Sequence, residues 1–113
     1  MIIDMKVFED LKENMGVDFI DEILDAYFEE TPKLIETLQQ TLEAGNFEGF
    51  TRAAHSIKST SNSVGALQYG ALARELEMAG KEKALDNVSG RVEALVSGFA
   101  EVKGDLEELT HAK

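Results

Sequence analysis

The sequence predicts an all-α protein, an antiparallel up-down four-helix bundle with a short additional N-terminal helix. Three observations support this fold class. Apolar residues recur at intervals of three and four along nearly the whole chain, which is the period of helices that bury one face. Proline occurs once in 113 residues, and glycine stands mostly between the periodic segments. Four long amphipathic helices with short connections pack most simply as an antiparallel bundle.

The first two helices are separated by Gly16. The short N-terminal helix, from about residue 4 to residue 14, carries the apolar residues Met5, Phe8 and Leu11. The second helix begins near Asp18, whose side chain suits the exposed amides of a helix start. Its apolar positions keep one helical phase on both sides of Pro32: Ile20, Ile23, Leu24, Tyr27, Leu34, Ile35, Leu38 and Leu42. Because a loop would usually reset that phase, we predict one long helix kinked at the proline.

Three further helices complete the bundle. A turn at residues 45–46 precedes a helix from about 47 to 63, and a fourth helix runs from about 67 to 79 and ends at Gly80. The fifth helix, from about 85 to 109, has a sustained apolar stripe: Leu85, Val88, Val92, Leu95, Val96, Phe99, Val102, Leu106 and Leu109. The bundle therefore spans about residues 18–109.

Length and composition limit the possible functions. The chain of 113 residues forms one domain, residues 1–113, since its length supports one core and not two. Without cysteine it has no disulfide, thiolate nucleophile or thiolate zinc site. Its formal charge of −11 repels nucleic acids and anionic membranes, so protein partners are expected. Its apolar runs are too short to cross a bilayer, and we expect it in the cytoplasm.

Motifs for catalysis or cofactor binding are missing from the sequence. There is no glycine-rich phosphate loop, no H-E-x-x-H zinc signature and no EF-hand loop. The helices lack the Glu-x-x-His pairs of di-iron bundles, and no nucleophile elbow accompanies the serines. We therefore expect no autonomous catalysis, no cofactor and no bound metal.

His55 is the main clue to function. At 100° per residue, the apolar positions of its helix share one side, and the other side holds Glu48, Thr51, Arg52, His55, Lys58, Ser59 and Asn62. His55 should therefore face water beside a lysine. Since its ordinary pKa is about 6.5, much of the imidazole is a neutral nucleophile at cytoplasmic pH. An exposed histidine often has no function, so its neighbours decide between that interpretation and a nucleophile for an anionic group.

Those neighbours carry a resemblance to a known family. The run from Ala54 to Ala66 resembles the signature of histidine-containing phosphotransfer (HPt) domains of two-component phosphorelays. It has Ala-His, an apolar residue, a lysine, small residues and then Gly-Ala. The resemblance also covers Asp18-Phe19-Ile20, Glu30-Thr31-Pro32, Gly45-Asn46-Phe47, Leu72 and Leu76-Glu77. It implies a four-helix bundle in which His55 accepts a phosphoryl group from a receiver-domain aspartate, or from a kinase, and passes it to another receiver.

The resemblance also implies roles for three other residues. Lys58 would neutralise phosphoryl oxygens as a compact charge. Glu77 matches the position from which some members orient the histidine: it would accept a hydrogen bond from Nδ1–H and leave Nε2 facing out. The alternative for Glu77 is an ordinary surface carboxylate. Ser59 stands where the family most often has glycine; its small side chain should be tolerated, and its hydroxyl can donate to phosphate.

Partners and alternatives follow from the same resemblance. The expected partners are receiver domains of response regulators, which bring the Mg²⁺ and the aspartate, and a sensor or hybrid histidine kinase. We expect a monomer that binds neither nucleic acid nor membrane. One alternative is a non-catalytic adaptor that binds a receiver or kinase, which His55 and Lys58 argue against. Another is the phosphoacceptor domain of a larger chemotaxis-type or hybrid kinase, although the initial methionine and short ends favour a stand-alone protein.

Overall fold

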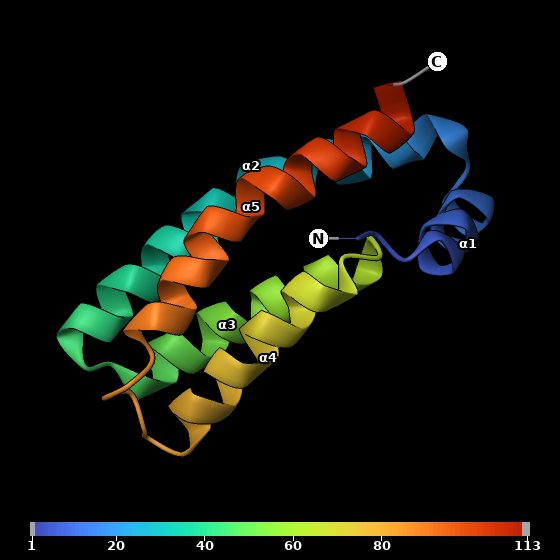
Figure 1. Cartoon of the computed structure of the whole chain (residues 1–113). Helices are drawn as coiled ribbons and strands as arrows, with labels where there is room; N and C mark the ends of the chain where they lie inside the picture. Colours follow the sequence, from blue (N-terminus) through green and yellow to red (C-terminus); the bar gives the residue numbers. More distant parts are fainter. Residues whose placement is uncertain (1, 112–113) are drawn as a thin grey trace.

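The computed structural model describes residues 2–111 and contains five helices and no strand within that range. They are α1 (Met5–Met15), α2 (Val17–Ala44), α3 (Phe47–Ser63), α4 (Leu67–Lys81) and α5 (Ser89–His111). Helices α2 to α5 alternate in direction and form an elongated bundle of 44 × 22 × 21 Å, with α5 lying along α2 and α1 placed at one end (Figure 1). The predicted fold class is confirmed.

The N-terminal segment is hydrogen-bonded to the turn that follows α3. The Asp4 side chain accepts a hydrogen bond of 3.0 Å from the Val7 amide and so caps α1. The Asp4 amide donates to the Gly65 carbonyl at 2.7 Å. Gly65 has a φ of +88°, and a Cβ there would lie 2.8 Å from the Asp4 carbonyl oxygen. Position 65 therefore takes glycine for two reasons, its backbone conformation and this close approach.

Helix α2 is continuous through Pro32, as predicted. Its capping position lies two residues earlier than expected, at Gly16 and not at Asp18. Asp18 lies in the first turn, where its negative charge is favourable next to the partial positive charge of the helix start. Among residues 2–111 no helix is both long enough and apolar enough to cross a membrane.

The predicted start of the last helix near residue 85 is wrong. Helix α4 continues past Gly80 to Lys81, and α5 begins only at Ser89. In the turn between them Lys83 has a φ of 56°, which a helix does not allow. Leu85 is partly buried against the core and Val88 is 1% exposed. Because both pack inward from a loop, their spacing imitated the apolar stripe of a helix.

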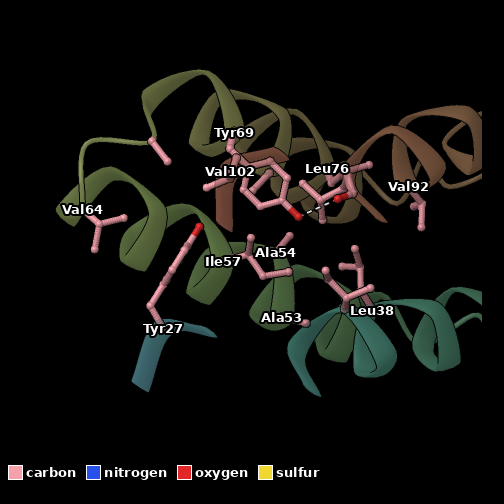
Figure 2. Close-up of a cluster of buried hydrophobic side chains, with 14 of the residues drawn as sticks. Tyr27, Leu38, Ala53, Ala54, Ile57, Val64, Tyr69, Leu76, Val92 and Val102 are labelled. Atoms are coloured by element: carbon pink, nitrogen blue, oxygen red, sulfur yellow. Dashed lines mark hydrogen bonds between the residues drawn. The ribbon is translucent and has the colours of Figure 1, made fainter. Parts of the chain in front are cut away.

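The core lies between the four long helices (Figure 2). Its largest fully buried side chains include Phe8, Leu24, Leu38, Phe50, Ile57, Tyr69, Leu76, Leu95 and Leu106. Two buried hydrogen bonds made by hydroxyl groups link helices within it. The Tyr69 hydroxyl donates to the Leu95 carbonyl at 2.6 Å, joining α4 to α5. The hydroxyls of Tyr27 and Ser61 lie 2.7 Å apart and join α2 to α3. Packing of its inner face thus fixes the rotation of helix α3, and with it the side chains that face outward.

Candidate functional site

His55 lies on the outer face of α3, as its phase in the sequence predicts. The inner face of that helix buries Phe50, Ala53, Ala54, Ile57 and Ser61. The His55 side chain is 57% exposed. The helix is fixed at its start by Asn46, whose side chain accepts a 2.9 Å hydrogen bond from the Gly49 amide. An apolar face packed against the core therefore sets the direction in which His55 points.

Glu77 of α4 reaches the imidazole from the neighbouring helix. Its Oε2 lies 2.7 Å from Nδ1 of His55, and its side chain is only 5% exposed. An ionised carboxylate can only accept hydrogen bonds, so Nδ1 carries the proton and donates it. Nε2 is then the ring nitrogen with the lone pair. The geometry places a nucleophilic nitrogen on a largely exposed ring whose other nitrogen is held by a buried charge.

A close approach of α3 and α4 makes this contact possible. Gly80 lies one turn beyond Glu77, and a Cβ at this position would collide with the Thr51 hydroxyl of α3. The Thr51 hydroxyl cannot easily turn away because it donates a 2.7 Å hydrogen bond to the Phe47 carbonyl. Glycine at position 80 therefore lets the two helices approach beside the site.

Two lysines share the same carboxylate. Lys58 Nζ donates to Glu77 Oε1 at 2.6 Å, and its side chain is 25% exposed. Lys81 Nζ lies 3.6 Å from Oε2 and is 59% exposed. The sequence indicated that Lys58 lies beside His55, but it gave no sign that its ammonium is bound to Glu77. Lys81 was missed, although its place four residues after Glu77 on one helix was an available signal.

The surroundings of Glu77 determine its charge. Burial is the largest single influence and raises the pKa of Glu77, but the hydrogen bonds from Lys58 and His55, together with their charges, outweigh it. The net result is a pKa below the ordinary value of 4.5. A buried carboxylate without such partners would be costly. Glu77 is therefore ionised at neutral pH and serves as the shared counter-ion of the site.

Ser59 and a shallow hollow border the site. Ser59 is exposed on α3 one turn after His55, and its carbonyl accepts a hydrogen bond from the Ser63 hydroxyl. The hollow of about 390 Å³ lies between α3 and α4 and is lined by Phe47, Glu48, Thr51, Arg52, His55, Glu77, Gly80, Lys81 and Lys83. Within residues 2–111 no group of three or more His, Cys, Asp or Glu side chains is arranged to hold a metal ion.

Comparison with known families decides the assignment. The family model described as "Hpt domain" matches residues 22–112, which is most of the chain. The chain belongs to the Hpt domain family. The resemblance found in the sequence is thereby confirmed.

Two known proteins are similar to this Hpt domain. Histidine-containing phosphotransfer protein 4 of Arabidopsis thaliana is 34% identical over 61 residues, which cover 51% of this chain and 47% of that protein. The chain thus spans about half the length of this curated relative. The crystal structure of histidine-containing phosphotransfer protein B (HptB) from Pseudomonas aeruginosa PAO1 superimposes with a TM-score of 0.90 at 24% identity, and covers 98% of this chain and 96% of that one. This structural match shows that the two share their helical bundle fold.

Proposed function

We propose that this chain is a phosphocarrier that receives a phosphoryl group on Nε2 of His55 and passes it to a receiver-domain aspartate. The observation that carries the proposal is the 2.7 Å contact between Nδ1 and the buried Glu77 carboxylate, with the imidazole 57% exposed. Family membership supports it. The Nε2 lone pair attacks the phosphorus of an aspartyl phosphate. The N–P bond forms as the acyl P–O bond breaks, and the electron pair leaves with the receiver's carboxylate.

Glu77 acts on the imidazole during this transfer. Nδ1 keeps its proton while Nε2 bonds to phosphorus, so positive charge develops on the ring. A fixed carboxylate 2.7 Å from Nδ1 stabilises that charge and preserves the reactive tautomer. The aspartate of a serine protease acts on its histidine in the same way. Glu77 therefore contributes without touching the phosphoryl group.

Lys58 and Ser59 are proposed to meet the phosphoryl oxygens. The Lys58 side chain is long, flexible and 25% exposed, so its ammonium can turn from Glu77 toward a dianionic group on His55. Such a positive charge stabilises a transferring phosphoryl group. Ser59 lies on the exposed side one turn away. Its small side chain leaves room for a partner, and its hydroxyl can donate to phosphate.

The partners complete the proposed reaction. Receiver domains supply the aspartate and the Mg²⁺, and a sensor or hybrid histidine kinase stands upstream. We propose that this chain has no resident cofactor and no autonomous catalytic activity, so that transfer between proteins uses the partner's catalytic groups. The exchange is placed in the cytoplasm, with the chain acting as a monomer. The acidic net charge of −11 makes nucleic acid an unfavourable partner.

The proposal is tested by mixing the protein with an aspartyl-phosphorylated receiver. We expect the wild-type chain to gain a phosphate that is labile in acid and stable in alkali, and His55→Gln to gain none. His111→Gln is the matched control, because it removes the only other histidine, and it should be labelled like the wild type. Labelling of His55→Gln, or no labelling of the wild type by a broad panel of receivers and kinases, would contradict the proposal.

A further inference from the structure

Two lysines approach Glu77 from opposite directions along the bundle. Lys58 follows His55 by three residues on α3, and Lys81 follows Glu77 by four residues on α4. Because α3 and α4 are antiparallel (Figure 1), these steps lead away from the site in opposite directions. Lys58 contacts Oε1 at 2.6 Å and Lys81 faces Oε2 at 3.6 Å. The lysines therefore need not compete for one position.

Phosphorylation would disturb this arrangement. If Lys58 turns to the phosphoryl oxygens, Glu77 loses its shortest cationic contact while negative charge accumulates nearby. A carboxylate that is only 5% exposed would then tend to take up a proton. A protonated Glu77 would no longer offer a full negative charge to Nδ1–H. The transfer needs that charge just when the ring becomes cationic.

We propose that Lys81 is a positioning residue that keeps Glu77 ionised while Lys58 is engaged by the phosphoryl group. This inference rests on the proposed function of His55. Lys81 is 59% exposed and free to adjust, and a shift of about 1 Å brings its ammonium into a charge-assisted hydrogen bond with Oε2. Among the described residues, the cationic groups within 4 Å of Glu77 are His55, Lys58 and Lys81. Lys81 is therefore the group available to replace Lys58.

The nearby charges provide a matched control. Arg52 lines the hollow beside the site but is paired with Glu48 at 2.6 Å. Lys83 lines the same hollow from the turn after α4. Lys83→Gln removes a positive charge from the same hollow as Lys81→Gln. Comparison of the two variants distinguishes the effect of losing positive charge in the hollow from the effect of losing a direct partner of Glu77.

The first experiment needs no phosphorylation. Lys58→Gln imitates the state in which Lys58 has left Glu77, and the pKa of the Glu77 carboxyl is followed by its ¹³C chemical shift. We expect Lys81→Gln to raise that pKa by about one unit more in the Lys58→Gln background than in the wild type. The ¹⁵N shifts of His55 should show a matching loss of the Nδ1–H tautomer. Lys81→Arg should retain the wild-type behaviour, and Lys83→Gln should leave both quantities unchanged.

The second experiment uses the phosphorylated protein. Phosphoramidate serves as the donor: its N–P bond breaks, the Nε2–P bond forms, and ammonia leaves. Lys81→Gln should raise the Glu77 pKa more in the phosphorylated protein than in the unphosphorylated one. The role of Lys81 would be overturned if Lys81→Gln changed the pKa of Glu77 equally in both forms. It would also be overturned if that substitution left the pKa unchanged in the Lys58→Gln background. Failure of His55 to accept phosphate from any donor counts against the proposed function instead, and the first experiment still decides the role of Lys81.

Discussion

At the scale of single residues, the site depends on one carboxylate with three partners. Glu77 is buried, yet its two oxygens face the imidazole of His55 and the ammonium groups of Lys58 and Lys81. This arrangement explains how a buried acid remains charged. It also gives the exposed histidine a defined tautomer, which an isolated surface histidine would lack. The tautomer of His55 is therefore a property of the cluster.

Replacing Glu77 by glutamine should show this dependence directly. We expect Glu77→Gln to slow phosphoryl transfer to His55 by about tenfold or more, because a charge-assisted hydrogen bond contributes roughly 1.5–3 kcal/mol. The measurement is the rate of labelling from a phosphorylated receiver. Glu75→Gln, an exposed change on the same helix, should leave the rate unchanged. A wild-type rate in Glu77→Gln would remove the carboxylate from the mechanism.

The Glu77→Gln variant also tests how the stability of the fold depends on pH. The pKa of Glu77 in the folded protein is below its ordinary value of 4.5, so its charged form stabilises the fold above that value. This contribution is lost as pH falls through the lower folded pKa. The difference in unfolding free energy between the wild type and Glu77→Gln should therefore decrease in acid below pH 4.5. Urea unfolding at several pH values measures it, and a difference independent of pH would contradict the assignment.

At the scale of the elements, the pairing of α3 with α4 creates the site. His55 and Glu77 are 22 residues apart and meet only because these helices pack side by side. Gly80 permits that approach, since a larger residue would strike Thr51. The packing of two helices thus controls a hydrogen bond that neither helix determines alone.

Gly80→Ala should separate the helices at the site. We expect a loss of about 1–3 kcal/mol in unfolding free energy from overpacking, together with slower labelling of His55. Thr51→Ala in the same chain should restore part of both losses, because it removes the hydroxyl that the new methyl group would meet. Gly104→Ala is the control: a Cβ there meets nothing within 4 Å, so it should stabilise α5 by up to about 1 kcal/mol. If Gly80→Ala and Gly104→Ala change stability and labelling alike, close approach of the helices at position 80 is not the cause of the losses.

At the scale of the whole molecule, charge is unevenly distributed around the site. Residues 52–91 contain six basic and four acidic residues, whereas the rest of the chain contains five basic and eighteen acidic residues. The segment that carries His55 and Glu77 thus has a net positive charge, whereas the rest of the chain taken together is strongly negative. Such an asymmetry favours the approach of an anionic group to this segment over the rest of the surface.

The bundle also depends on a buried link between its last two helices. The Tyr69 hydroxyl is fully buried and donates to the Leu95 carbonyl at 2.6 Å (Figure 2). Burial raises the pKa of Tyr69 far above its ordinary value, so the hydroxyl remains a donor. Tyr69→Phe should cost about 0.5–1.5 kcal/mol of unfolding free energy, since it removes one buried hydrogen bond while the Leu95 carbonyl, inside α5, keeps its helical one. Urea unfolding measures the loss, while labelling of the folded variant should equal that of the wild type; slower labelling would mean that α5 also affects the site.

Much of this protein was determined by its sequence alone. Apolar spacing depends on local helical geometry, and it correctly predicted five helices, the continuity of α2 through Pro32 and the outward direction of His55. It failed at residues 85–88, because apolar residues of a packed turn have the same spacing as a helix face. Periodicity reports burial and not the backbone conformation that produces it.

The tertiary structure decided the chemistry around His55. The sequence left Glu77 open between an orienting partner and a surface carboxylate, and only the packing of α4 against α3 buries it within 2.7 Å of Nδ1. The same packing places Lys58 on Glu77 and brings Lys81 to its other oxygen. Helical phase can be inferred within one segment. The distance between side chains on two helices depends on how closely and in what register those helices pack, and that is a property of the folded chain.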